Sequence, residues 1–149
     1  MISTAPLKTC ASPYESFSLM GVRITPKVIG SETAGQFSMV EAVVAPGAGD
    51  TANITRSRTK VFYVASGEFE FLLGTITKRL SAGDTIFIPA GAIHRFQNVG
   101  TVPGTLFTTF TPAGYETFLR ELSDLFQGED VRPEDVAALA QEYGVEAVD

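Results

Sequence analysis

Short apolar runs separated by glycine and proline fill most of the chain before residue 111. Residues 68–73 (EFEFLL) begin with strict alternation of glutamate and phenylalanine, which is the period expected of a half-buried β-strand. The other runs are rich in β-branched and aromatic residues and end at glycine or proline turns. We therefore predict strands at 36–44, 60–65, 68–73, 76–80, 85–88, 94–99 and 105–110.

These predicted strands indicate an all-β fold. No stretch between residues 21 and 110 has the length and the 3.6-residue period of a crossover helix, which argues against a parallel α/β sheet. Short strands divided by turns at this spacing are typical of a sandwich or a barrel.

The hydrophobic period changes after residue 111. Thr111-Pro112 is typical of a helix N-cap followed by a proline at the first helical position, and Gly128 ends the run. Apolar residues between them recur at spacings of three and four. They are Tyr115, Phe118, Leu119, Leu122, Leu125 and Phe126.

A second helix is predicted from Pro133 to Gly144. Its apolar face carries Val136, Leu139 and Tyr143. The pattern divides the chain into an N-terminal arm (1–17), a β-domain (18–111) and a helical extension (112–149).

Charge is distributed unevenly along the 149 residues. Residues 1–112 hold nine basic and seven acidic side chains, whereas residues 113–149 hold two and ten, for a net charge of -6. We interpret the acidic excess as a solvated helix face, with a partner surface as the alternative. The chain has no basic patch for nucleic acid, no apolar run that spans a bilayer and no signal pattern, so we expect a cytoplasmic protein without nucleic-acid or membrane partners.

Cysteine and histidine each occur once. A single cysteine, Cys10, excludes an internal disulfide and any multi-cysteine metal site, and we assign it no function. A single histidine, His94, excludes metal sites that need two imidazoles from one chain. It is also the one candidate for histidine acid–base chemistry.

Residues 83–98 (GDTIFIPAGAIHRFQN) combine a turn glycine, a strand, a Pro-x-Gly corner and a returning strand that bears His94. The spacing of Gly83, Pro89, Gly91, His94 and Asn98 resembles the second signature motif of the cupin family. Every named position of that motif is matched.

The upstream segment is similar to the first cupin motif, but only in part. Gly47 and Gly67 occupy the two glycine positions. Where that motif has two histidines and a glutamate, this chain has Asn53, Thr55 and Lys60.

The resemblance covers about residues 20–111, and the helical tail is similar to the bacterial quercetin-dioxygenase-like branch of small single-domain cupins. It implies an all-β jelly roll, a double-sheet β-barrel with two C-terminal α-helices. It also implies a pocket inside the barrel for a small-molecule ligand, and a homodimer.

In that family three histidines and one glutamate hold a divalent metal. Asn53 and Thr55 offer only neutral oxygen donors, and the ammonium of Lys60 has no lone pair and repels cations. One remaining imidazole does not make a specific site. We therefore expect no metal and no other cofactor, and the family's dioxygenase chemistry is lost with the metal.

Two orientations of Lys60 remain open. Its ammonium could extend to water at the barrel mouth. Alternatively it could point inward and serve as a positive centre for an anionic ligand, or as an amine for proton transfer or imine formation. Lys60 and His94 are then the predicted catalytic pair, with His94 either an acid–base group or a hydrogen-bonding group.

Other pocket roles follow from the predicted strands. Asn53 and Thr55 are predicted to bind substrate through hydrogen bonds, and Phe96 should share the face of His94 as an apolar wall. Arg56 and Arg58 could recognise a carboxylate or phosphate, but a solvated loop is the simpler interpretation.

Three functions remain as hypotheses. The first is a metal-independent isomerase, cyclase or lyase that uses Lys60 and His94. The second is a non-catalytic binding or sensor protein. The third is a metal-dependent oxygenase whose rearranged ligands include His94 with Glu68 or Glu70, although these glutamates follow the Gly67 turn and lie away from the expected ligand positions.

Overall fold

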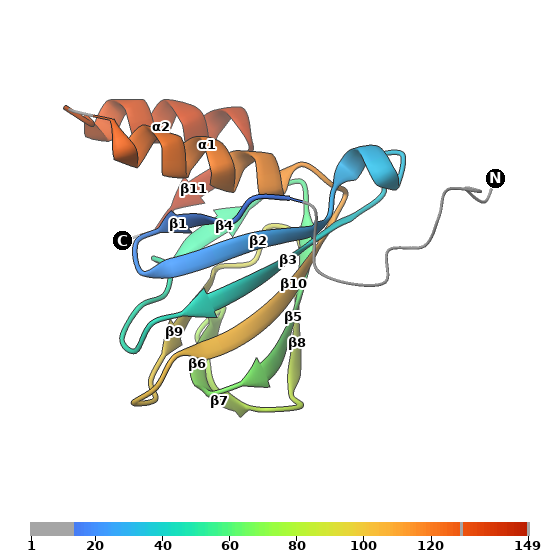
Figure 1. Cartoon of the computed structure of the whole chain (residues 1–149), viewed down its shortest axis with the longest axis vertical. Helices are drawn as coiled ribbons and strands as arrows, with labels where there is room; N and C mark the ends of the chain where they lie inside the picture. The colour runs from blue at the N-terminus through green and yellow to red at the C-terminus, as the bar shows by residue number, and fades with distance from the viewer. Residues whose placement is uncertain (1–13, 129, 149) are drawn as a thin grey trace.

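The computed structural model describes residues 14–128 and 130–148. The predicted arm at 1–17 therefore lies mostly outside the described residues, together with Cys10. Within the described part, the chain folds into two antiparallel β-sheets followed by two helices (Figure 1).

The larger sheet has the strand order β1-β2-β3-β10-β5-β8. Its strands are β1 (Phe17–Leu19), β2 (Val22–Val28), β3 (Ser38–Val44), β5 (Thr59–Ser66), β8 (Thr85–Ile88) and β10 (Gly104–Thr111). The smaller sheet has the order β11-β4-β9-β6-β7. Its strands are β4 (Asn53–Thr55), β6 (Glu68–Leu73), β7 (Ile76–Ser81), β9 (His94–Asn98) and β11 (Val145–Ala147).

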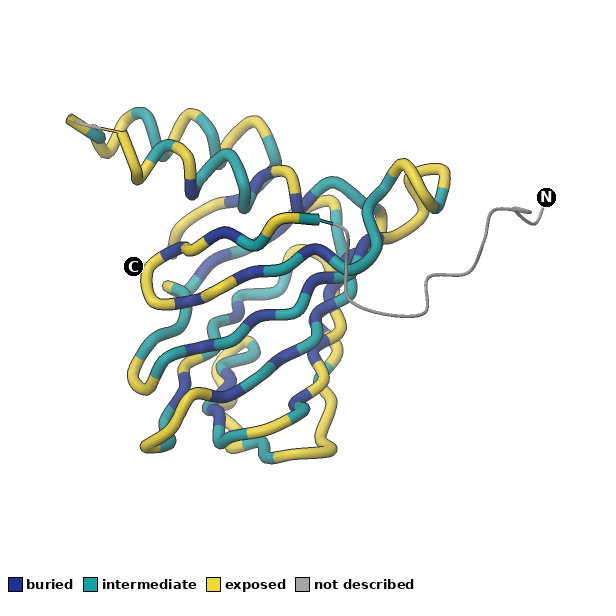
Figure 2. Tube along the Cα trace, in the orientation of Figure 1, coloured by how far each residue is buried: buried dark blue, intermediate teal, exposed yellow. Residues whose placement is uncertain are grey.

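The core lies between the two sheets. Strands β3 and β10 alternate between buried and half-exposed residues along most of their length, and this alternation continues across the larger sheet in Figure 2. Phe62, Phe69, Phe71 and Phe96 form an aromatic cluster with ring centroids 5.1 to 6.5 Å apart. Phe62, Phe69 and Phe71 are buried, and full burial of such a side chain contributes about 1.5 to 3 kcal/mol.

One glycine is required by this packing. A Cβ at Gly104 would lie 2.7 Å from the ring of Phe69, which is itself fully buried. Strand β10 therefore approaches the aromatic cluster without a side chain at this position.

Helices α1 (Tyr115–Gln127) and α2 (Pro133–Glu142) lie side by side over the edge strands β1 and β11 (Figure 1). Glu116 fixes α1 by accepting a hydrogen bond from the backbone N–H of Gly30 at 3.0 Å, next to the short 3₁₀ helix η1 (Gly30–Glu32). Ser123 donates to the carbonyl of Ser18 at 2.6 Å. The two helices thus cover the edge of the sheets that β1 and β11 form.

All seven predicted strands are present, with ends shifted by at most two residues. Four strands were not predicted, namely β1, β2, β4 and β11. Three of these are only three residues long, and β2 contains Pro26, which lowers its strand signal.

The predicted helix start at Thr111-Pro112 is wrong. Strand β10 continues through Thr111, because its backbone pairs with Thr59 of β5, and α1 begins at Tyr115 with Gly114 as its N-cap. The second helix does begin at Pro133, as predicted, and ends at Glu142 just before Gly144. Neither helix, nor any other within the described part, is long and apolar enough to cross a membrane.

Candidate functional site

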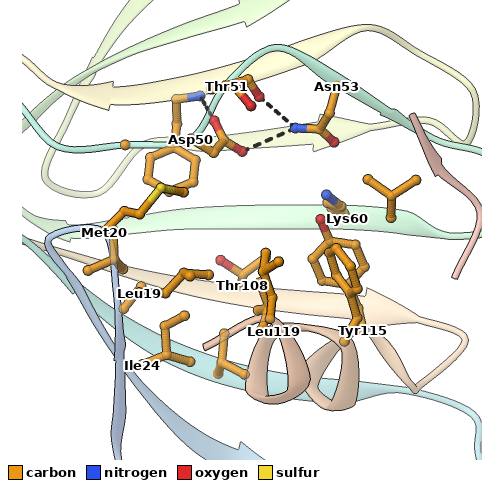
Figure 3. Close-up of a pocket in the computed structure, with 18 of the residues that line it drawn as sticks. Leu19, Met20, Ile24, Asp50, Thr51, Asn53, Lys60, Thr108, Tyr115 and Leu119 are labelled. Carbon is orange, nitrogen blue, oxygen red and sulfur yellow. Dashed lines mark hydrogen bonds between the residues drawn. The ribbon is translucent and has the colours of Figure 1, made fainter. Parts of the chain in front are cut away.

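A cavity of about 380 Å³ lies between the sheets and beneath the helices (Figure 3). Most of its wall is aliphatic or aromatic and comes from β1, β2, β3, β5, β10 and α1. Met20 and Phe126 line it as well, with 58% and 42% of their surface exposed. They mark the place where the cavity meets solvent.

Polar side chains gather in one part of this wall. They are Asp50, Thr51, Asn53, Lys60, Thr108 and Tyr115. In Figure 3, Lys60 points between the Asp50–Asn53 pair on one side and the ring of Tyr115 on the other. The cavity therefore offers an apolar body and one polar end.

Lys60 points into the protein. Only 2% of its surface is exposed, so the alternative orientation toward water is excluded. Its Nζ lies 2.9 Å from Nε2 of His94 and 4.0 Å from the ring centroid of Tyr115. The cation–π contact and the hydrogen bond hold the amine in one position.

His94 lies on the side of Lys60 that faces away from the cavity. Its Nδ1 is 3.0 Å from the carbonyl oxygen of Ala92, which can only accept a hydrogen bond, so Nδ1 carries the proton. Nε2 is then the acceptor, and Lys60 is the donor. His94 is 2% exposed and is not one of the residues that line the cavity.

Burial shifts the pKa of both members of this pair. It lowers the pKa of Lys60 to about 7; the charge of Asp50 opposes this shift and that of Arg58 adds to it. Burial and the nearby Lys60 lower the pKa of His94 to about 4. At neutral pH His94 is thus uncharged, and Lys60 exists in both protonation states.

Asp50 was not predicted as a site residue. Burial raises its pKa to about 6, although its Oδ1 accepts a hydrogen bond from the backbone N–H of Phe96 at 2.7 Å. The Nδ2 of Asn53 lies 3.4 Å from its other oxygen. Its sequence position, three residues before Asn53 within the first motif segment, is the signal that could have identified it.

The predicted pocket residues on β4 take two different positions. Asn53 lines the cavity and donates to the carbonyl of Thr51 at 2.9 Å. Thr55 is buried behind it, and its Oγ1 lies 3.5 Å from Oδ1 of Asn53. Thr55 also hydrogen-bonds Tyr115, whose pKa is raised by burial, so that its hydroxyl stays protonated.

Phe96 lines the cavity, in agreement with the predicted apolar wall, and its ring lies 5.7 Å from that of Phe62. The two predicted arginines do not reach the cavity. Arg56 pairs with Glu146 on the surface at 2.9 Å. Arg58 lies near the carbonyls of Ala113 and Tyr143 at 3.3 and 3.4 Å, where it joins the segment before α1 to the end of α2.

The residues present do not fit the divalent metal site of the cupin family, which the sequence resembles. Glu68 and Glu70 alternate with the buried Phe69 and Phe71 on β6, and they lie 3.7 and 3.8 Å from Arg79 and Arg95, away from His94. Across the described residues, no three His, Cys, Asp or Glu side chains are grouped to hold a metal ion. The Nε2 lone pair of His94, which would bind a metal, accepts from Lys60 instead.

Comparison with known proteins agrees with the sheet arrangement. Residues 40–110 match a family model described as a cupin domain. A 68-residue stretch is 31% identical to mannose-1-phosphate guanylyltransferase 2 of Escherichia coli O157:H7, covering 46% of this chain and 14% of that enzyme. The match therefore spans only a small part of the relative's length.

Solved structures with low sequence identity share the fold. An RmlC-like cupin from Shewanella frigidimarina has a TM-score of 0.64 at 22% identity, over 76% of this chain and 96% of that one. KdgF from Halomonas sp. gives 0.63 at 19%, over 70% and 93%. A predicted oxalate decarboxylase from Thermotoga maritima gives 0.61 at 17%, over 66% and 90%. The chain has a cupin jelly-roll fold followed by two helices.

Proposed function

We propose that this chain binds a small organic molecule with an apolar body and one polar end, and that it does so without a metal. The observation that carries this proposal is Lys60, whose side chain is only 2% exposed and lies at the polar end of a cavity with a mostly apolar wall. An ammonium without water is costly, so its retention favours a role toward a ligand.

The polar end of the cavity changes charge across neutral pH. Near pH 5.5 the pKa values make Lys60 a cation, and Asp50 is largely uncharged. Near pH 8.5 the net charge of this end is negative, because Lys60 is then mostly a neutral amine and Asp50 is a carboxylate. His94 is uncharged throughout. The affinity for an anionic group should therefore be higher at pH 5.5 than at pH 8.5.

The neutral amine also supports the proposal of a metal-independent isomerase, cyclase or lyase. In such an enzyme Lys60 and Asp50 exchange protons with the ligand, and His94 positions Lys60. A non-catalytic binding protein is the alternative, because it would need the same cavity. We propose that the chain descends from the quercetin-dioxygenase-like branch of cupins but does not catalyse its reaction, since dioxygenase chemistry requires a redox metal.

Fluorescence titration with 8-anilinonaphthalene-1-sulfonate tests ligand binding, since this probe has an aromatic body and one anionic group. We expect saturable binding that weakens from pH 5.5 to pH 8.5, and a loss of about tenfold in affinity at pH 5.5 in Lys60→Met. The matched control is Lys78→Met, on the exposed strand β7. Equal affinity of Lys60→Met and the unmodified protein would contradict the proposal.

Elemental analysis tests the metal-free part. Protein produced with added iron, manganese, nickel, copper and zinc should contain each of them at well below one ion per chain. One tightly bound transition metal per chain that survives dialysis would show that the donor set has been misjudged.

A further inference from the structure

We propose that Lys60 is a nucleophile that captures an apolar aldehyde or ketone as an imine. This inference deepens the proposed function and rests on it, because the carbonyl compound must first enter the cavity. It is carried by the position of Nζ, which lies in the cavity wall and is held from behind by His94.

The hydrogen bond to His94 does not use the lone pair of a neutral Lys60. A neutral amine has two N–H bonds and one lone pair, and His94 accepts one of the N–H bonds at 2.9 Å. The imidazole is fixed in this role, because its other nitrogen donates to Ala92. The lone pair of Nζ therefore does not point toward His94; it and the second N–H bond share the directions toward the Tyr115 ring and the cavity.

The environment supplies the neutral amine that the reaction needs. Burial brings the pKa of Lys60 to about 7, so much of it is unprotonated at neutral pH. A lysine with an ordinary pKa is neutral in only about one molecule in a thousand at pH 7.5.

Asp50 supplies acid–base chemistry beside Lys60. In the first step the Nζ–C bond forms, the carbonyl π bond breaks, and the proton lost by nitrogen is taken up by oxygen, giving a carbinolamine. In the second step the C–O bond breaks and the oxygen leaves as water with a proton from Asp50, whose raised pKa of about 6 keeps a small fraction of it protonated at pH 7.5. The remaining carboxylate faces the iminium cation. No oxidant or reductant is consumed.

The rest of the wall selects the ligand's body. Leu19, Ile24, Phe62, Leu106, Phe118 and Leu119 present only hydrocarbon to the cavity. A sugar or another polyhydroxylated carbonyl compound would lose its hydrogen bonds to water here without replacement. The expected class is an aromatic or aliphatic carbonyl compound small enough for about 380 Å³.

Reductive trapping tests the imine directly. The protein is incubated at pH 7.5 with benzaldehyde, cinnamaldehyde or octanal and sodium cyanoborohydride, and adducts are located by peptide mass spectrometry. We expect Lys60 to be modified at least about tenfold faster than the exposed Lys78 by one or more of these aldehydes. Lys60→Arg, which keeps the charge, should lose this adduct, and Lys78→Arg should keep it.

Labelling of Lys60 no faster than Lys78 with all three aldehydes would overturn the imine proposal. Lys78 serves as the internal measure that the reagents have reacted. Binding of 8-anilinonaphthalene-1-sulfonate is measured on the same samples. If that probe binds through Lys60 while no preferred adduct forms, the imine proposal fails alone; if it does not bind either, the proposed function fails with it.

Discussion

Lys60 lies where water cannot solvate its charge, and each of its neighbours has a separable effect. Tyr115 and Asp50 favour the ammonium, whereas burial and the guanidinium of Arg58 favour the neutral amine. His94 accepts its hydrogen bond in either state. The residue is therefore balanced near neutral pH, and its protonation is linked to folding.

Stability should rise with pH above 7 because of Lys60. The folded pKa, about 7, lies below the unfolded value of 10.5, so the folded chain binds fewer protons in this window. The free energy of unfolding should increase by up to about 1.4 kcal/mol per pH unit between pH 7.5 and 9.5. Urea unfolding of Lys60→Met should lack this rise, whereas Lys78→Met should retain it.

Parallel pH profiles of the unmodified protein and Lys60→Met would show that Lys60 keeps an ordinary pKa.

Below pH 6.5 little net change in the free energy of unfolding is expected, because Asp50 and His94 act in opposite directions. The raised pKa of Asp50 makes stability fall as pH rises through 4 to 6, and the lowered pKa of His94 makes it rise through 4 to 6.5.

Asp50→Asn separates proton transfer from binding. Without the carboxyl group, trapping of aldehydes at Lys60 should slow by about tenfold or more, because no acid assists the loss of water. Binding of 8-anilinonaphthalene-1-sulfonate at pH 8.5 should tighten, since the repelling carboxylate is gone. Unchanged trapping together with tighter binding would remove Asp50 from the reaction but keep it in the cavity wall.

At the scale of elements, the helices cover the cavity through a row of aromatic rings. Phe110 of β10, Tyr115 and Phe118 of α1, and Tyr143 after α2 lie in sequence with centroid distances of 4.7, 5.2 and 5.3 Å. Because Tyr115 also contacts Lys60, the position of α1 helps to determine the shape of the polar end.

Shortening an aromatic side chain of this row should weaken the packing of α1 over the cavity. Phe118 is 4% exposed and lines the cavity, so Phe118→Ala should lower the free energy of unfolding by about 3 to 5 kcal/mol. Phe126→Ala, at the mouth and 42% exposed, should cost about 1 kcal/mol or less. Chemical denaturation compares them, and equal losses would indicate that α1 is not packed on the core as described.

At the scale of the whole molecule, the outer face of the larger sheet carries an apolar group. Val61 and Tyr63 of β5 and Phe87 of edge strand β8 are 40%, 43% and 54% exposed, and Val61 lies opposite Phe87 in the strand register. We predict that this face forms the expected homodimer. Light scattering should give a dimer for the unmodified chain and a monomer for Phe87→Glu, with Ile76→Glu on exposed β7 as the control that stays dimeric.

A monomeric unmodified chain at high micromolar concentration would exclude this prediction.

The sequence by itself determined the local structure and the kind of site. Alternation at 68–73 and the Gly and Pro turns defined strands, because backbone pleating and turn conformations are local properties. Motif spacing brought Asn53, Thr55, Lys60 and His94 into one hypothesis, and the structure does bring them together. Three-residue strands such as β4 carry too short a pattern to be seen.

Only the tertiary structure decided what the site can do. The direction of Lys60, the burial of its amine and the partnership with Asp50 and Tyr115 arise where β5, the loop before β4 and α1 meet. Solvation and charge interactions depend on distance in space, and residues 50 and 115 are far apart along the chain. For this reason His94, which the sequence marked as a catalytic candidate, lies behind the amine that faces the cavity.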